Sequence, residues 1–298
     1  MTALHDASLT HAPRRPSRTA EPSTDGVPQA AASGLRVMMC PPPQSSAADL
    51  HQWGRRMLRY DAARAATQWA ALRETIAGLG VEVVLPAERP DEPDQMVIGD
   101  AAILAAGKAI AARFAQPRRE GELVAVRATL DAAGFEIATP PPEMVLEAGQ
   151  VAVSHFTLFG GWFENRERLG LTWAARQLAL RLVALRLASD QFDRLDLCFR
   201  PLRPEMALCL PQAFEPADFK TLRESVSMLL AVPIEEAARG ACSVVTLGRD
   251  VLLPTGCDRT AGLLDAAGFA VHTVDVSEFR TIGSSLAGLV LPLATPQA

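Results

Sequence analysis

Histidines are scarce in this sequence, and its cysteines follow no metal-binding pattern. Its 298 residues include 5 histidines (His5, His11, His51, His155 and His272), and none of them falls in an HExxH-type spacing. The 5 cysteines form no CxxC pair, and an odd number of cysteines is typical of reduced thiols. We therefore expect no bound metal and no other cofactor, and the reduced thiols favour a cytoplasmic protein.

Long apolar runs and basic stripes are also missing. The best candidate for a membrane span, Leu178–Ala188, is interrupted by Arg181 and Arg186, and the N-terminus has no hydrophobic signal core. Acidic and basic residues are interspersed, and the net charge is −5. A nucleic-acid-binding protein would concentrate its basic residues on one face. The sequence therefore predicts neither a membrane partner nor a nucleic-acid partner.

The composition changes near residue 34. Residues 1–34 are rich in Ala, Pro, Ser and Thr and show neither helical nor strand periodicity, which predicts a disordered N-terminal tail. Apolar residues make up 49% of the chain, enough for a substantial core. We expect one folded domain over residues 35–298.

A unit of helix, glycine and strand recurs along the chain. Its first copy begins with an amphipathic helix, because apolar residues at Ala62, Ala66, Trp69, Leu72 and Ile76 fall at steps of three and four. A glycine followed at once by a β-rich segment then ends each of the three clearest copies: Ala77–Pro86, Asp131–Pro140 and Asp265–Val274. These copies indicate an internally repeated α/β architecture, or alternatively a coincidental similarity between Ala- and Gly-rich joints.

Short apolar segments predict the strands. A hairpin turn is expected at Gly248–Asp250, and the segment ending at Glu278 and Phe279 is predicted to be a short strand. The other predicted strands are Leu35–Cys40, Val81–Leu85, Leu195–Phe199, Met206–Leu210, Leu230–Ile234, Ser243–Leu247, Val251–Leu253 and Leu289–Leu293.

Several motifs occur in a recognisable order. They are MCPP at Met39–Pro42, Pro93-Asp94 leading to Asp100, Arg118–Glu120, Glu147 with Gly149, Leu195–Phe199, Ser277–Phe279 and the closing GSSLAGLVLPL. In this order they resemble the bacterial dimethylarginine dimethylaminohydrolases of the guanidine-modifying (amidinotransferase, or pentein) superfamily. The resemblance implies a single α/β domain built as a propeller of five ββαβ modules around a central pocket.

The resemblance also implies a chemistry. In that family a cysteine attacks the guanidinium carbon, a histidine handles protons, and carboxylates clamp the cationic guanidinium group. Asp100, Glu147 and Asp196 match the clamp positions, although each is alternatively a solvated or capping carboxylate. Arg166 lies in the region where the family has an arginine that binds the substrate carboxylate, although Asn165 holds the matching position.

Two catalytic positions differ from the family pattern. The family's histidine corresponds to Arg194, which cannot act as a general base near neutral pH, and its cysteine corresponds to Gly288, which has no side chain. We therefore expect an inactive or repurposed relative that binds a small guanidino or amino-acid ligand, as a homo-oligomer or beside an active relative. Alternatively, it is an enzyme on such substrates by a non-cysteine or relocated-cysteine mechanism. Cys198 is then the thiol to test, unless it is a core residue.

Arg194 itself suggests how the pocket has changed. Residues two apart in a strand share a face, so Arg194 and Asp196 are predicted to project together. Three carboxylates without a cation would repel one another, and a guanidinium group from within the chain would neutralise them. We predict a salt bridge from Arg194 to Asp196 or Glu147, in a pocket that is self-occluded or remade for a less cationic ligand.

Overall fold

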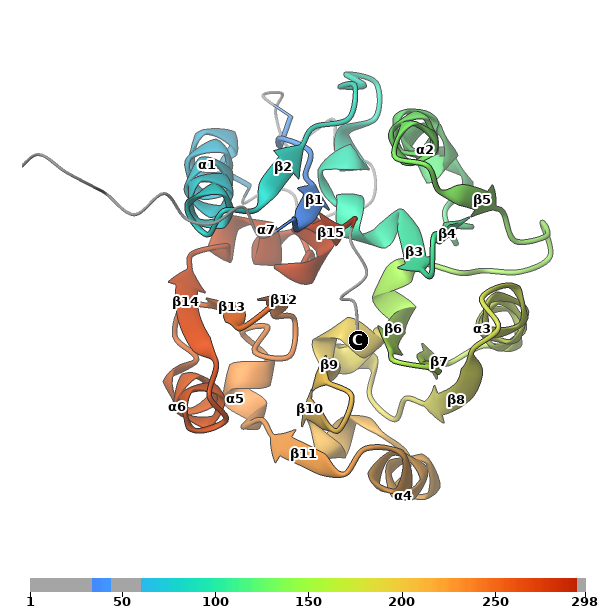
Figure 1. Cartoon of the computed structure of the whole chain (residues 1–298), viewed down its shortest axis with the longest axis vertical. Helices are drawn as coiled ribbons and strands as arrows, with labels where there is room; N and C mark the ends of the chain where they lie inside the picture. Colours follow the sequence, from blue (N-terminus) through green and yellow to red (C-terminus); the bar gives the residue numbers. More distant parts are fainter. Residues whose placement is uncertain (1–33, 44–59, 294–298) are drawn as a thin grey trace, which may run out of the picture. The chain divides into compact units, whose positions relative to one another are not determined.

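The computed structural model describes residues 34–43 and 60–293. Residues 1–33 of the predicted disordered tail lie outside these residues. The described residues form five three-stranded sheets that follow one another around a common centre, with the long helices on the outside (Figure 1). In each sheet the middle strand pairs antiparallel with one neighbour and parallel with the other, and a helix connects the two parallel strands. This is the predicted arrangement of five ββαβ modules.

Four of the modules are continuous in sequence. They are β3 (Ala102–Ala105), β4 (Lys108–Ala111), α2 (Leu123–Ala132) and β5 (Glu136–Ala138); β6 (Val151–Ser154), β7 (Thr157–Trp162), α3 (Asn165–Gln177) and β8 (Arg181–Arg186); β9 (Phe199–Arg203), β10 (Met206–Cys209), α4 (Pro216–Ser225) and β11 (Met228–Ala231); and β12 (Val245–Leu247), β13 (Asp250–Pro254), α6 (Asp258–Ala266) and β14 (Ala270–Val274). Of two short helices, α5 (Ile234–Ala237) lies between β11 and β12, and α7 (Ser277–Thr281) follows β14.

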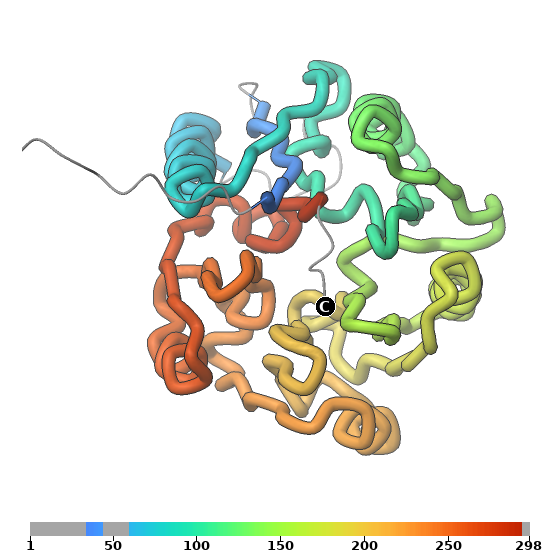
Figure 2. Tube along the Cα trace, viewed as in Figure 1, coloured from blue at the N-terminus to red at the C-terminus, as the bar shows by residue number. Residues whose placement is uncertain are grey.

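The remaining module joins the two ends of the described chain. The first strand, β1 (Arg36–Met38), pairs antiparallel with the last, β15 (Leu291–Pro292), and parallel with β2 (Glu82–Val84). Helix α1 (Ala62–Gly78) connects β1 to β2. In Figure 2 the red end of the chain therefore lies against its blue beginning. This pairing closes the ring, so the last segment of the chain contributes to the centre.

The recurring glycines end their helices as predicted. Gly80, Gly134 and Gly268 have φ of 76°, 85° and 83°, in the left-handed region that favours glycine. Each follows a helix end at once and precedes the strand that pairs parallel with its module's middle strand. The repeated sequence unit thus corresponds to a repeated structural unit.

The predicted face of α1 is correct except at one position. Trp69, Leu72 and Ile76 are buried in the core, but Ala65 is buried in place of the exposed Ala66. The helix begins at Asp61, whose side chain accepts a hydrogen bond from the backbone N–H of Arg64 at 3.0 Å. None of the described helices is long and apolar enough to cross a bilayer.

Several predicted strands are wrong in type or position. The segment at Glu278 and Phe279 is helical and belongs to α7, and the N–H of its first residue, Ser277, donates to Asp275 Oδ1 at 3.0 Å. The predicted strand at Leu230–Ile234 is shifted to Met228–Ala231, and Ile234 begins α5. The predicted strand at Leu195–Phe199 is a 3₁₀ turn at Leu195–Leu197, followed by β9.

The other predicted strands lie within a few residues of those observed. The predicted hairpin turn connects β12 to β13, with Leu247 opposite Asp250. In the closing segment, a 3₁₀ turn at Ala287–Leu289 replaces the start of the predicted strand, and only Leu291–Pro292 pairs.

Candidate functional site

The candidate residues occupy equivalent places in successive modules. Asp100 ends a 3₁₀ turn before β3, Glu147 precedes the turn Ala148–Gln150 before β6, and Asp196 lies in the turn before β9. Gly288 lies in the turn before β15. Neighbouring turns of this series contact one another. Because the modules surround one centre, the repeat itself brings these positions together, although they lie far apart in the sequence.

Arg194 is bonded to two of the predicted carboxylates. Its Nε lies 3.1 Å from Asp196 Oδ1 and its Nη2 lies 2.8 Å from Asp196 Oδ2, a bidentate pair. Its Nη1 donates to Asp100 Oδ2 at 3.0 Å. The predicted salt bridge to Asp196 is therefore confirmed. Arg194 and Asp196 do not share a strand face, as the sequence had predicted, since Arg194 precedes a 3₁₀ turn and does not lie in a strand.

Gly149 makes room for this guanidinium group. A Cβ at Gly149 would lie 2.9 Å from Arg194 Nε and 3.0 Å from its Cζ. Any larger residue at this position would push Arg194 away from Asp196. The glycine of the sequence motif is thus explained by the close approach of the arginine side chain.

A second guanidinium group, that of Arg119, is buried near the carboxylates Asp100 and Glu147. Arg119 is 1% exposed and forms a bidentate pair with Glu122, with N···O distances of 2.8 and 3.1 Å. Its Nη1 lies 3.7 Å from Asp100 Oδ2 and 3.9 Å from Glu147 Oε2. Arg119 belongs to the motif Arg118–Glu120, but its role and that of Glu122 were not predicted from the sequence. The spacing of three residues between them was the only available signal.

Burial and charge shift the pKa values in this cluster. Burial alone would lower the pKa of Arg194, but the Asp100 and Asp196 carboxylates raise it well above its ordinary value. Burial, followed by the Asp100 charge, raises the pKa of Glu147, against the opposing effect of Arg119. Burial raises the pKa of Glu122 to about 7, although Arg119 lowers it. Arg194 is therefore a permanent cation and not a proton acceptor.

Two serines of the closing motif, Ser284 and Ser285, lie next to Gly288. Ser285 Oγ donates to Asp196 Oδ2 at 2.8 Å and accepts a hydrogen bond from the N–H of Gly288 at 3.1 Å. A Cβ at Gly288 would lie 3.0 Å from Ser284 Oγ and 3.1 Å from Val97 Cγ1. Both neighbours are side-chain atoms, and Gly288 does not have a positive φ. The backbone therefore does not require glycine here.

We expect Gly288→Ala to lower the free energy of unfolding by about 1 kcal/mol, because the added Cβ crowds two buried side chains that need to move by only a few tenths of an ångström. Urea unfolding of the purified variant measures the change. Gly99→Ala is the contrasting variant, since its Cβ would collide with the backbone carbonyl of Ala287, and it should unfold at lower urea. Equal losses for the two variants would contradict the expectation for Gly288.

A cavity of about 480 Å³ opens at the centre. Glu147, Arg194, Ser284 and Ser285 line it, whereas Asp100 and Asp196 do not. Asp100 is 1% exposed and Asp196 is 5% exposed. Arg194 thus stands between the cavity and these two carboxylates. A ligand in the cavity meets a guanidinium group where the family resemblance implied a guanidinium-binding surface.

Neither a thiol nor an imidazole of the described residues lines this cavity. All five cysteines are described, and all are free and buried. Cys198 is 0% exposed, its Sγ lies 3.5 Å from the carbonyl oxygen of Leu195, and burial raises its pKa well above the ordinary value. A reactive cysteine needs the opposite shift. Cys198 has the environment of a core residue.

The structure does not bring Arg166 to the cluster. It is exposed in the first turn of α3, and its Nε donates to the carbonyl oxygen of Glu143 at 3.3 Å. It does not line the central cavity. Its role as a ligand for a substrate carboxylate therefore stays a prediction.

The chain is similar in sequence to known enzymes, although no protein-family model matches it. Over 274 residues it is 26% identical to ArgZ of Synechocystis, a bifunctional arginine dihydrolase/ornithine cyclodeaminase, covering 89% of this chain but only 38% of ArgZ. Over 222 residues it is 28% identical to N(G),N(G)-dimethylarginine dimethylaminohydrolase of Mycobacterium tuberculosis, covering 74% of this chain and 73% of that protein.

A solved structure shows the same fold. The N-terminal domain of an ArgZ variant, covalently bound to a reaction intermediate, superposes with a TM-score of 0.80 at 24% identity. The match covers 87% of this chain and 98% of that domain. The five-module architecture of the present chain is therefore shared with a domain whose chemistry passes through a covalent intermediate.

Proposed function

This chain is a member of the guanidine-modifying (pentein) superfamily, related to arginine dihydrolases and dimethylarginine dimethylaminohydrolases, and from that premise we propose that it binds a small molecule without hydrolysing it. The observation that carries the proposal is the bidentate pairing of Arg194 with Asp196, together with its bond to Asp100. Arg194 fills the guanidinium site with a guanidinium group of the chain itself.

The loss of covalent chemistry follows from the groups around the cavity. An attack on a guanidinium carbon needs a nucleophile and a proton acceptor beside it. Ser285 is the hydroxyl closest to a carboxylate there, but both oxygens of that carboxylate, Asp196, already accept hydrogen bonds from Arg194. Ser285 is therefore not activated in the way that a histidine activates a cysteine or serine.

One observation favours a second candidate function. Glu147 lines the cavity and has a raised pKa, which is the usual state of a general acid or base near neutral pH. The alternative is an enzyme on guanidino or amino-acid substrates that needs no covalent attack and uses Glu147 for proton transfer. Assembly as a homo-oligomer or with an active relative stays a prediction in either case.

A direct assay separates the two functions. We expect the full chain, incubated with L-arginine or with asymmetric dimethylarginine, to form no citrulline above a protein-free blank, while an active arginine dihydrolase in parallel does. Repeated turnover by this chain would overturn the proposal. If Glu147→Gln abolished that turnover, the second candidate function would replace it.

A further inference from the structure

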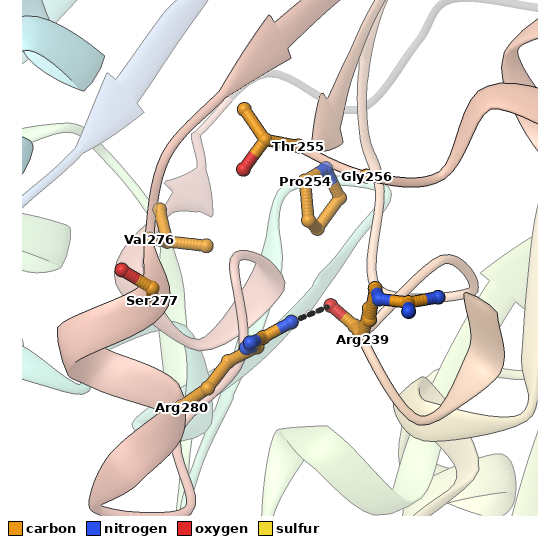
Figure 3. A pocket seen from close by; sticks show the side chains of 7 residues that line it. All are labelled: Arg239, Pro254, Thr255, Gly256, Val276, Ser277 and Arg280. Atoms are coloured by element: carbon orange, nitrogen blue, oxygen red, sulfur yellow. Dashed lines mark hydrogen bonds between the residues drawn. The ribbon is translucent and has the colours of Figure 1, made fainter. Parts of the chain in front are cut away.

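A smaller cavity of about 180 Å³, whose lining residues are drawn in Figure 3, shares part of its lining with the central cavity. Its polar side chains are two arginines and two hydroxyls, from Arg239, Arg280, Thr255 and Ser277, and no described acidic residue lines it. Arg239 and Arg280 also line the central cavity, as do Pro254 and Val276. The two arginines therefore stand where the smaller cavity meets the larger one.

Among the residues that the structure describes, each of the two arginines has one side-chain hydrogen bond, and its other donor groups have no partner. Arg280 Nη1 donates to the carbonyl oxygen of Arg239 at 3.1 Å, the bond drawn in Figure 3, and Arg239 Nη1 donates to the carbonyl oxygen of Glu235 at 3.1 Å. Within residues 34–43 and 60–293, neither arginine forms an ion pair with a carboxylate. Arg194 and Arg119 differ, since each is paired with acidic groups. Two cations with open donors beside a cavity favour an anion.

The central cavity contributes a second, independent feature. Ser284 is 4% exposed, lines the central cavity, and its Oγ has no hydrogen-bond partner among the described residues. A buried hydroxyl without a partner is costly unless a ligand or a water molecule satisfies it. Asp190 and Asp193 also line the central cavity, but both are exposed and lie outside the lining of the smaller one.

We propose that the junction of the two cavities binds the anionic group of a small carboxylate or phosphate compound, held by Arg280 and Arg239, with the rest of the compound extending toward Ser284. The proposal deepens the proposed function and rests on it, since it names the ligand class of the same central site. The cavity that the resemblance predicts for a cation takes an anion here.

Isothermal titration of the full chain with inorganic phosphate and with malonate tests this assignment, with sodium chloride of matched ionic strength as the blank. We expect saturable binding of at least one anion. Arg280→Gln and Arg239→Gln should each weaken it roughly tenfold or more, because a charge-assisted hydrogen bond is lost. Binding of phosphate alone or of malonate alone identifies the source of the anionic group.

Arg249→Gln is the matched control. Arg249 is also an exposed arginine that donates to a carbonyl oxygen, that of Gly268, but it lines neither cavity. Its variant should bind the anion as the unchanged chain does. Absence of binding by the unchanged chain, or an equal loss in Arg249→Gln, would overturn the anion site. Citrulline formation would instead overturn the non-hydrolytic function, so the two failures are distinguishable.

Discussion

Arg194→Ala is expected to lower the melting temperature by about 10 °C, and methylguanidinium is expected to restore most of this loss. The variant leaves Asp196, which is 5% exposed, without a guanidinium partner, and Asp100, which is 1% exposed, with only Arg119 Nη1 at 3.7 Å. Removing one partner of a buried ion pair costs about 3–5 kcal/mol, because the remaining charge stays buried and unpaired. For a domain of this size, each kcal/mol corresponds to about 2–4 °C.

The rescue separates the loss of a specific ligand group from a general loss of packing. Methylguanidinium is planar and can form the bidentate pair with Asp196, whereas methylammonium carries the same charge without that geometry. Thermal unfolding should therefore show a saturable increase with methylguanidinium only. Arg166→Ala, an exposed arginine with one bond to the Glu143 carbonyl oxygen, should melt as the unchanged chain does. Equal stabilisation by both cations would count against a retained guanidinium site.

The rescued variant also bears on the origin of the site. If methylguanidinium binds where the Arg194 side chain was, the two carboxylates still form the guanidinium clamp of the superfamily. The single arginine is then what blocks the clamp. Gly149 would support this assignment, because its missing Cβ provides the space that the guanidinium plane occupies. The change from a substrate site to an internal ion pair would have required one substitution at position 194.

The sequence predicted the recurring unit of helix, glycine and strand because its signals are local, whereas the count of five ββαβ modules came from the family resemblance. A helix that ends in a left-handed glycine and continues directly into a strand depends only on neighbouring residues, and Gly80, Gly134 and Gly268 show it each time. The pairing of Arg194 with Asp196 was also predictable, since a separation of two residues keeps both close to one site. The order of the motifs along the chain carried the family resemblance, and the resemblance indicated which residues lie together at the central site.

The turns at the centre were not predictable in the same way. Leu195, Leu197 and Phe199 alternate with other residues as they would in a strand, and Leu195 and Phe199 are both fully buried. The alternation is satisfied by a 3₁₀ turn that packs Leu195 inward and then enters β9. Period-two alternation over so few residues cannot distinguish these two conformations.

Arg119 and Glu122 were missed for a different reason. Two opposite charges three residues apart usually form a solvated helix face. Here Phe114 packs against the guanidinium group, with Arg119 Cζ 4.0 Å from the ring centroid, and the pair is 1% and 2% exposed. Only the tertiary arrangement, which brings Asp100 and Glu147 to the same arginine, reveals that the pair is internal.

Glu122 is expected to make the stability of the protein fall as pH rises. Its pKa in the folded chain is about 7, compared with an ordinary value of 4.5, so the folded state holds this proton more tightly than the unfolded state. The stabilisation is complete below the ordinary pKa and is lost as pH rises through about 7. Over this range the free energy of unfolding should change by about 3 kcal/mol from this group alone.

Glu122→Gln isolates this contribution, because glutamine does not titrate. Urea unfolding across the range should show the unchanged chain losing stability relative to the variant as pH rises, by about 3 kcal/mol in total. Glu120→Gln is the control, since Glu120 is 32% exposed in its pair with Arg113 and should leave the pH profile unchanged. A constant difference between the unchanged chain and Glu122→Gln at every pH would mean that Arg119 keeps Glu122 ionised throughout.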